Sequence, residues 1–224
     1  MSDLLPATEP TATLMDGIYR YQRHIYDVSR HYYLLGRDRM IAELDVPAGG
    51  TVLEVGCGTA RNLVAIARAY PDAEIYGIDI STEMLKSADA TVRKARLQHR
   101  VRPVYGDAAD LDAHGQFGLR GFDRIVFSYS LSMIPPWRHA LASAVDNLAP
   151  GGEIHIVDFA GQRDLPAWFG KGLRTWLDKF HVSPRLEVGT ELALQSARVG
   201  GSARVRSIHR DYAMIGRLKR GPLR

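Results

Sequence analysis

The sequence predicts an α/β protein built on a seven-stranded, mostly parallel β-sheet with helices on both faces. From residue 51 onward, apolar segments typical of buried strands alternate with segments of helical periodicity. The apolar run 51–55 stops at a glycine-rich loop, residues 56–59, and a helical pattern begins at about Ala60. The C-terminal run 203–224 alternates apolar and polar residues, which predicts a closing pair of strands with the last one antiparallel. Together these features predict a Rossmann-like sheet.

The remaining strands are each bounded by turn residues and are expected over 73–79, 101–105, 121–127 and 153–157. Helices are expected over 60–69, over 138–148, and after Ser81, whose hydroxyl suits an N-cap. Residues 1–14 are rich in Pro and Thr and are expected to be disordered. Residues 15–46 are expected to form a helical lid, with a helix end at Gly36, and residues 47–224 a single domain.

The composition limits the class of protein. The chain has 224 residues, of which 46% are hydrophobic, and a single cysteine, so no disulfide framework forms within it. No apolar run approaches the length that spans a bilayer. The first residues lack the basic start and long apolar core of a signal peptide, so we expect a cytoplasmic protein.

The charge is uneven along the chain. Residues 163–224 carry thirteen Lys and Arg against five Asp and Glu, a net charge of +8, while the whole chain has +4. A basic C-terminal third predicts an anionic partner, either nucleic acid or an anionic membrane surface. The alternative is a solvated basic face without a partner.

The glycine loop predicts the ligand. Gly56 and Gly58 lack a Cβ, which lets backbone N–H groups approach a ligand closely. A dinucleotide site requires a third glycine, but Arg61 occupies that position, so a pyrophosphate fits poorly. Glu54 lies at the carboxyl end of the strand and suits a ligand with an ammonium group and a sulfonium. S-adenosylmethionine is such a ligand; the alternative is an ordinary strand–turn–helix connection. Cys57 is interpreted as a small residue in a tight turn.

Polar residues follow the other strands at the same edge of the sheet. Asp79 lies 21 residues beyond Gly58, where an acid accepts hydrogen bonds from both ribose hydroxyls of a nucleotide. Asp107 can accept from the adenine amine or cap the turn that follows it, and both roles are open. The segment Ser128, Tyr129 and Ser130 follows the fourth strand and should face the methyl group and its acceptor.

These motifs, in this order over residues 52–159, resemble class I S-adenosylmethionine-dependent methyltransferases. Two flanking runs are more specific. Residues 19–41, YRYQRHIYDVSRHYYLLGRDRMI, and residues 176–185, WLDKFHVSPR, are similar to the N-methyltransferases of betaine-lipid synthesis. The resemblance implies methylation of diacylglyceryl-homoserine to its trimethyl form with three S-adenosylmethionine molecules. One departure is Ala60, where many members of the wider family have glycine.

The resemblance also implies roles for individual residues. The methionine end of the cofactor is assigned to Glu54, Gly56 and Gly58, the ribose to Asp79, and the adenine to Asp107 and Ala108 between the apolar walls Ile80 and Met84. In the N-terminal run, Tyr26, Tyr33 and Arg37 are expected to reach the cofactor. The full predicted cofactor-binding set also contains Cys57, Asn62, Ser128 and Tyr129.

Methyl transfer to an amine requires mainly orientation, because the cofactor is already activated. The amine must be neutral, and a desolvated pocket favours that form, so a general base is optional. We predict Tyr129, His181 and Tyr33 as catalytic residues, and we expect no metal. His155 is a weaker candidate, because it lies within a strand as core histidines do. An aromatic cage for the quaternary ammonium product is assigned to Tyr33, Tyr129 and Trp176.

The acceptor lipid implies a membrane. We expect the C-terminal run, which ends with Arg217, Lys219 and Arg220, and the helix over 15–33 to face an anionic bilayer together, at the inner face of the membrane. The preceding aminocarboxypropyl-transferase of the pathway is a candidate partner. A phosphatidylethanolamine or other small-molecule methyltransferase is the main alternative. A nucleic-acid acceptor is not expected, because the run SYSLSMIPPW lacks the opening Asp or Asn of those enzymes. A non-catalytic binding module would not require Glu54 and Asp79.

Overall fold

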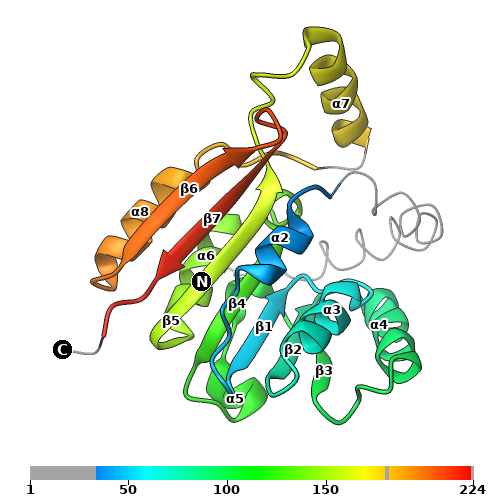
Figure 1. The fold of residues 1–224 in the computed structure, drawn as a ribbon, viewed down its shortest axis with the longest axis vertical. Helices are drawn as coiled ribbons and strands as arrows, with labels where there is room; N and C mark the ends of the chain where they lie inside the picture. The colour runs from blue at the N-terminus through cyan, green and yellow to red at the C-terminus, as the bar shows by residue number, and fades with distance from the viewer. Residues whose placement is uncertain (1–33, 180–181, 223–224) are drawn as a thin grey trace, which may run out of the picture.

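The structure, a computed structural model, describes residues 34–179 and 182–222 and contains one seven-stranded sheet (Figure 1). Its strands are β1 Thr51–Val55, β2 Glu74–Asp79, β3 Val101–Tyr105, β4 Phe122–Ser128, β5 Leu148–Phe159, β6 Ser202–Ile208 and β7 Ala213–Lys219. The strand order is β3-β2-β1-β4-β5-β7-β6. Strand β7 is antiparallel to both neighbours, and the other neighbouring pairs are parallel. The predicted fold class is confirmed.

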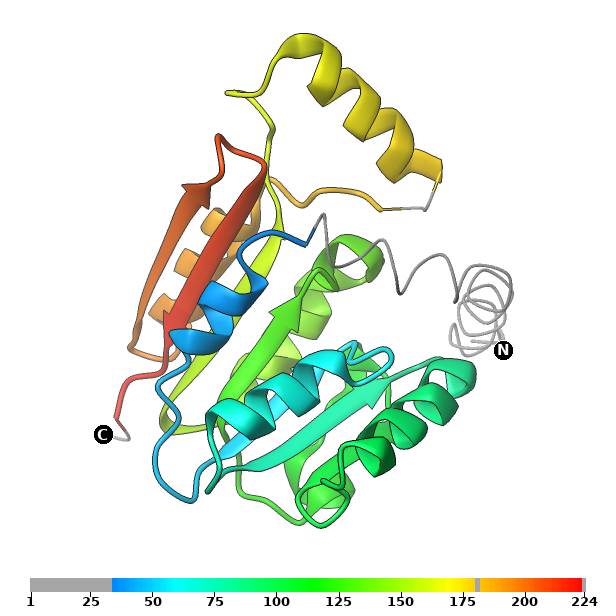
Figure 2. The same ribbon diagram turned by 45° about the vertical axis from the view of Figure 1, so that its right-hand side comes forward.

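Helices cover both faces of the sheet, as Figure 2 shows from a second direction. One face carries α2 Arg37–Ala42, α3 Arg61–Ala69 and α4 Thr82–Lys94, and the other carries α5 Ala113–Phe117, α6 Trp137–Asp146 and α8 Val188–Arg198. Helix α7, Ala167–Lys179, extends beyond the sheet. Two short 3-10 helices, η1 Ala108–Asp110 and η2 Leu131–Met133, follow β3 and β4. No helix of the described residues is long and apolar enough to cross a membrane.

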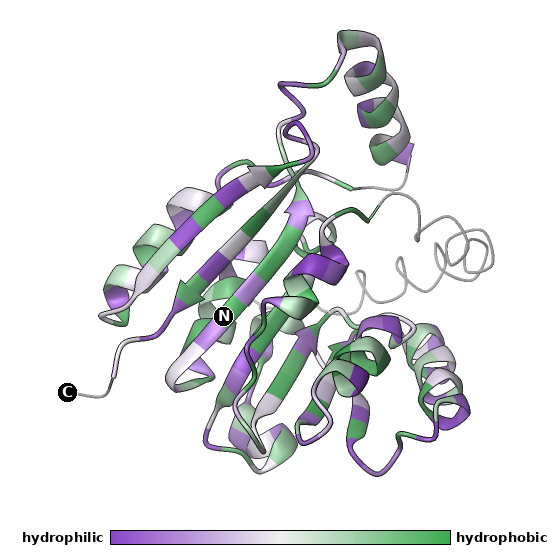
Figure 3. Ribbon diagram, viewed as in Figure 1, coloured by the Kyte–Doolittle hydropathy of each residue, from purple (hydrophilic) through white to green (hydrophobic). Residues whose placement is uncertain are grey.

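The alternation of side chains along each strand divides the core in two. In β1, Val52 packs with the α2–α4 layer, while Leu53 and Val55 pack with the α5–α8 layer. The central strands are accordingly apolar on both faces, and Figure 3 shows hydrophobic residues along them. A sheet buried on both sides is rigid, so it fixes the positions of the loops at its edges.

The strand order determines where a ligand can bind. The chain runs from β1 outward through β2 to β3, then crosses back to β4 on the other side of β1. The loops that follow β1 and β4 therefore diverge at the middle of the sheet. In open α/β sheets a crevice forms at this switch point, outside the carboxyl ends of the strands.

Some boundaries differ from the sequence prediction. Helix α6 ends at Asp146, because the Asn147 side chain bonds Leu111 O at 2.8 Å and accepts from Ala113 N at 2.7 Å. Strand β5 begins at Leu148 and not at residue 153, since Leu148 pairs with Phe122 before a register shift. A helix begins at Arg37, after Gly36 with φ 85°. The rest of the predicted lid, up to residue 33, lies outside the described residues.

Candidate functional site

The glycine loop after β1 turns tightly against the end of β2. Gly56 and Gly58 have φ of 74° and 53°, and a Cβ on Gly56 would lie 2.8 Å from the Cβ of Ser130. The amides of Gly56 and Cys57 both donate to Ile78 O at 2.9 Å, and the Gly58 amide donates to Asp79. The expectation that these N–H groups face a ligand was wrong, because β2 already accepts from them. Engaged amides suit a ligand without phosphate at this loop.

Asp79, the last residue of β2, holds this loop in place. Its Oδ2 accepts from Gly58 N at 2.8 Å, and its Oδ1 accepts from Ser81 N at 2.9 Å. Ser81 in turn caps α4 by accepting from Met84 N, as predicted. A carboxylate has about four lone-pair sites, so an acid of this kind can accept from a ligand as well as from the backbone. Its role toward a ribose stays a prediction.

Glu54 is a buried acid beside the glycine loop. Its side chain is 1% exposed, and its Oε1 accepts from Asn62 Nδ2 at 2.6 Å. Asn62 lies in the first turn of α3, so the loop brings these two predicted residues together. A buried carboxylate attracts a ligand cation strongly, because water screens it little.

The predicted adenine residues lie at the carboxyl ends of β2 and β3. Asp107 Oδ1 accepts from Ala109 N at 2.8 Å, so the N-cap role is confirmed. Ala108 opens η1, Ile80 is half-buried, and Met84 is buried. Contact between these residues and an adenine stays a prediction.

Residues 128–134, which begin at the last residue of β4, are predicted to face the acceptor and are here called the acceptor loop. The hydroxyls of Ser128, Ser130 and Ser132 are buried and have no hydrogen-bond partner among the described residues. Buried polar atoms are normally paired, so orphaned hydroxyls point to a ligand or water as their partner. Ser130 lies against Gly56, which places the acceptor loop beside the glycine loop.

Tyr129 is the strained member of the acceptor loop, with φ 55°. Its hydroxyl donates to Leu35 O at 2.6 Å, and its ring meets Phe159 edge-on with centroids 4.7 Å apart. Burial raises the pKa of the Tyr129 phenol far above its usual range. The phenol is therefore neutral, and its hydroxyl ties the segment before α2 to the acceptor loop.

Replacing Tyr129 by phenylalanine is expected to lower methyl transfer by less than about tenfold and the free energy of unfolding by about 1 kcal/mol. The ring contact with Phe159 remains, and only the hydrogen bond to Leu35 is lost. Initial rates over a pH series and thermal unfolding measure both effects. A loss of activity above about a thousandfold with unchanged unfolding would instead identify Tyr129 as the proton acceptor.

Asp158 and Arg185, which the sequence analysis did not select, form hydrogen bonds with the backbone of the acceptor loop. Asp158, at the end of β5, is fully buried and accepts from Ser132 N at 3.0 Å and from Phe159 N at 2.8 Å. Burial raises the pKa of Asp158 to about 6. Arg185 Nε donates to Leu131 O at 3.2 Å and its Nη2 to Ile134 O at 3.1 Å. Asp158 could have been found, because it directly follows the predicted strand 153–157, as the other site acids follow theirs. No pattern in the sequence indicated Arg185.

The other predicted site residues lie away from the glycine loop and the acceptor loop, have core positions, or fall outside the described residues. Tyr26, Tyr33 and His181 fall outside the described residues. Arg37 opens α2 and donates to Asp38 at 2.8 Å. The remaining candidates have core positions: Trp176 is half-buried on α7, His155 is buried in β5, and Cys57 is buried in the glycine loop. Burial raises the pKa of the Cys57 thiol. In residues 34–179 and 182–222, no cluster of His, Cys, Asp and Glu could hold a metal.

Comparison with known proteins shows what the described domain resembles. Residues 52–152 match a family model described as a methyltransferase domain. A demethylmenaquinone methyltransferase of Listeria welshimeri is 29% identical over 149 residues, covering 66% of this chain and 61% of that protein. One of Geobacillus stearothermophilus is 30% identical over 145 residues, covering 59% and 60%. The chain thus spans about three fifths of the length of the curated relatives it matches.

Solved structures share the fold. A SAM dependent methyltransferase from Aquifex aeolicus aligns with a TM-score of 0.64 at 18% identity, over 89% of this chain and 97% of that one. A putative methyltransferase of Haloferax volcanii, solved with a methyltransferase activator, aligns with a TM-score of 0.71 at 15% identity, over 93% and 98%. Residues 52–152 thus resemble a methyltransferase domain, and the chain shares its fold with solved methyltransferases.

The residues present fit S-adenosylmethionine. Gly56 approaches Ser130 so closely that a Cβ would not fit, and Glu54 is a buried carboxyl group that would suit the ammonium group. The hydroxyls of Ser128 and Ser130, which have no hydrogen-bond partner among the described residues, belong to the loop beside Gly56. The engaged amides of the glycine loop agree with a cofactor that lacks phosphate.

Proposed function

We propose that this protein transfers methyl groups from S-adenosylmethionine to the amino group of diacylglyceryl-homoserine, three times in succession. One observation carries the proposal: both sequence runs that resemble the betaine-lipid enzymes contact the acceptor loop. Leu35, in the run 19–41, accepts from Tyr129. Ser183 and Arg185, in the run 176–185, bond Ser132 O, Leu131 O and Ile134 O. The two runs that resemble the betaine-lipid enzymes thus contact the loop to which we assign the choice of acceptor.

The cofactor supplies an activated methyl group, and the chain supplies position. Glu54 and Asn62 would hold the methionine end, Asp79 the ribose, and Asp107 the adenine side of the crevice. The acceptor loop would place the amine in line with the methyl group and exclude water. Exclusion of water also lowers the pKa of an ammonium acceptor, so the reactive neutral amine is favoured.

The acceptor loop suits an amine acceptor better than an acceptor that must first lose a proton to a base. Its described side chains offer serine hydroxyls and a neutral phenol, and both Asp158 oxygens accept backbone amides. A neutral amine attacks without a dedicated base. A quinone acceptor is the second candidate, because the curated relatives at 29% and 30% identity are demethylmenaquinone methyltransferases. Carbon methylation of a quinol requires removal of a hydroxyl proton, for which the loop offers no free carboxylate among the described residues.

The deciding experiment offers the purified protein three acceptors with S-adenosylmethionine: diacylglyceryl-homoserine, phosphatidylethanolamine, and demethylmenaquinone that a chemical reductant keeps in its quinol form. We expect mass spectrometry to find the mono-, di- and trimethyl forms of the first lipid only. A variant with Asp79→Ala serves as the cofactor-deficient control. Methylation of demethylmenaquinone alone would establish the second candidate. Methylation of phosphatidylethanolamine alone would show that the acceptor is a lipid amine with a different head group from the one proposed.

A lipid acceptor places the enzyme at a membrane surface. We propose peripheral association with the anionic inner face, where the preceding aminocarboxypropyl-transferase would release its product. The net charge of +8 over residues 163–224 supports attraction to anionic lipid. No nucleic-acid partner is proposed.

A further inference from the structure

Helix α7 stands away from the body of the protein (Figures 1 and 2). It follows β5 and is held by one stripe of side chains: Leu173 and Trp176 pack against the core and Leu177 is 1% exposed. Its opposite stripe and its N-terminal end face outward. A helix attached along one side only leaves its other side available for a second surface.

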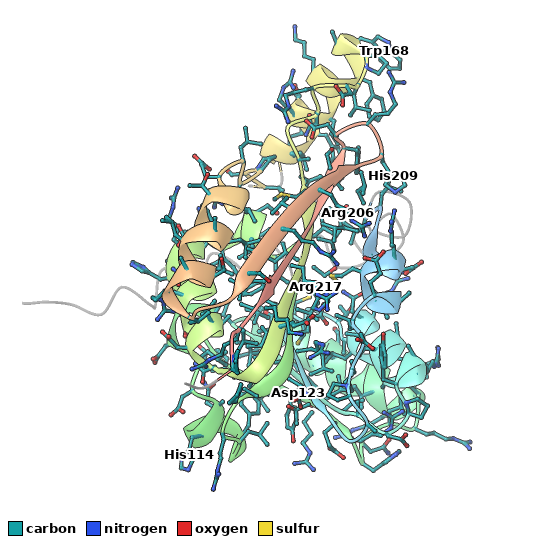
Figure 4. The ribbon with its side chains drawn as sticks, turned by 60° about the vertical axis from the view of Figure 1, so that its left-hand side comes forward. His114, Asp123, Trp168, Arg206, His209 and Arg217 are labelled. Carbon is teal, nitrogen blue, oxygen red and sulfur yellow. The ribbon has the colours of Figure 1, made fainter. Side chains whose placement is uncertain are left out.

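The N-terminal end of α7 exposes two adjacent aromatic rings. Trp168 is 77% and Phe169 is 40% exposed, and their rings meet edge-on with centroids 5.8 Å apart. Figure 4 shows Trp168 at the end of the molecule, pointing away from the sheet. The other large exposed apolar residues of the described part are scattered singly, namely Tyr105, Leu186, Leu194 and Val205. An exposed aromatic pair marks an interaction surface, whereas single exposed apolar residues are ordinary.

Cations lie along the same helix and just before it. Lys171, Arg174 and Lys179 are exposed along α7, and the Arg163 side chain just before the helix is 83% exposed. Residues 163–179 carry four Lys and Arg against two Asp, a net charge of +2. Aromatic rings at the surface with Lys and Arg beside them are typical of helices that lie in a membrane interface, where the rings enter the headgroup region and the cations meet anionic lipid.

The position of α7 matches the position of the acceptor loop. The chain runs from α7 through Val182 into Ser183 and Arg185, which bond the acceptor loop. By contrast, Arg217 and Lys219 pair with Glu153, where β5 first pairs with β7 and six residues before the carboxyl end of β5 at Phe159. The basic end of β7, expected from the sequence to face the bilayer, is thus remote from the acceptor edge.

We propose that α7 docks on an anionic lipid bilayer through Trp168 and Phe169, with Lys171 and Arg174 at the headgroups. This arrangement holds the acceptor loop at the membrane, where a lipid amine can enter without leaving the bilayer. The inference rests on the proposed function only in taking a lipid as the acceptor. Docking itself is a property of the helix and can be measured without methyl transfer.

The test is co-sedimentation of the full chain with vesicles of phosphatidylcholine and phosphatidylglycerol in equal amounts. We expect the double variant Trp168→Ala, Phe169→Ala to partition at least about tenfold more weakly than the wild type. Leu194→Ala, which removes a 62% exposed apolar side chain from α8, is the matched control and should bind normally. The double variant should keep its affinity for S-adenosylmethionine, since exposed side chains contribute little to the fold.

The charge component has its own test. Lys171→Glu with Arg174→Glu should weaken binding to these vesicles, and added salt should remove the difference between this variant and the wild type. Vesicles of phosphatidylcholine alone should bind the wild type weakly. Equal binding of the wild type and the aromatic double variant would overturn the proposal, as would a wild type that ignores the anionic vesicles.

A third outcome is contact with a second protein copy. A wild-type dimer in light scattering that the aromatic double variant converts to monomer, without vesicle binding, would overturn the proposal. Methylation of diacylglyceryl-homoserine dispersed in detergent separates docking from catalysis. The double variant should retain that activity and lose activity on vesicles. A wild type that binds vesicles through α7 but methylates none of the lipids would support docking and contradict the proposed function.

Discussion

Replacing Asp79 by alanine is expected to weaken S-adenosylmethionine binding by about two to three orders of magnitude. The Asp79 carboxylate accepts from the amides of Gly58 and Ser81, at 2.8 and 2.9 Å. Hydrogen bonds to a charged group contribute about 1.5–3 kcal/mol each, and every 1.4 kcal/mol is a factor of ten in affinity. The variant therefore loses the group that shapes the glycine loop together with the predicted ribose acceptor. Isothermal titration calorimetry with S-adenosylmethionine measures the loss.

Two further variants separate these contributions. Asp79→Asn keeps one acceptor oxygen and the size of the side chain, so an intermediate affinity is expected. Asp146→Ala removes an exposed carboxylate that pairs with Arg198 at 2.6 Å and should leave the affinity unchanged. If Asp79→Ala bound the cofactor within about fivefold of the wild type, the assignment of this edge of the sheet as the cofactor site would be wrong.

The strands were predictable because each is a local pattern. The run 51–55 appears in the structure with the same bounds, and 73–79 and 101–105 differ by at most one residue. Each is an apolar segment between turn residues, and neither property depends on distant parts of the chain. Helices α7 and α8 were not predicted, since the region between β5 and β6 has no strong boundary signals.

The site was predictable at the level of the backbone. Parallel strands place their carboxyl ends at one edge, so the residues after β1, β2 and β4 had to converge there. The hydrogen bonds were not predictable. Tyr129 and Leu35 are 94 residues apart, and Arg185 and Leu131 are 54 apart, so no local pattern in the sequence indicates that they are bonded. The structure also explains a departure noted in the sequence: Ala60 has φ 63°, which glycine adopts without strain.

Replacing Glu153 by glutamine is expected to lower the free energy of unfolding by about 3 kcal/mol. Glu153 is 2% exposed, and its Oε2 accepts from Arg217 Nε at 2.5 Å and lies 3.2 Å from His155 Nε2. Glutamine keeps the size of the side chain but removes the charge that Arg217 faces. Breaking a buried ion pair leaves its partner uncompensated, which typically costs about 3–5 kcal/mol. Urea unfolding measures the loss, and Glu74→Gln, which removes a half-exposed partner of Arg102 at 3.9 Å, is the matched control.

The same pair makes the protein sensitive to acid. Burial alone raises the pKa of Glu153, but hydrogen bonds from His155 and Arg217 outweigh burial and hold this pKa at about 2, below the usual 4.5. A pKa lower in the folded state gives stability that is fully present above pH 4.5 and is lost as the pH falls toward 2. The wild type should therefore lose stability over this window, and Glu153→Gln should lose less. Parallel curves for the two proteins would contradict the assignment, because the carboxylate at position 153 would then titrate alike in the folded and unfolded chain.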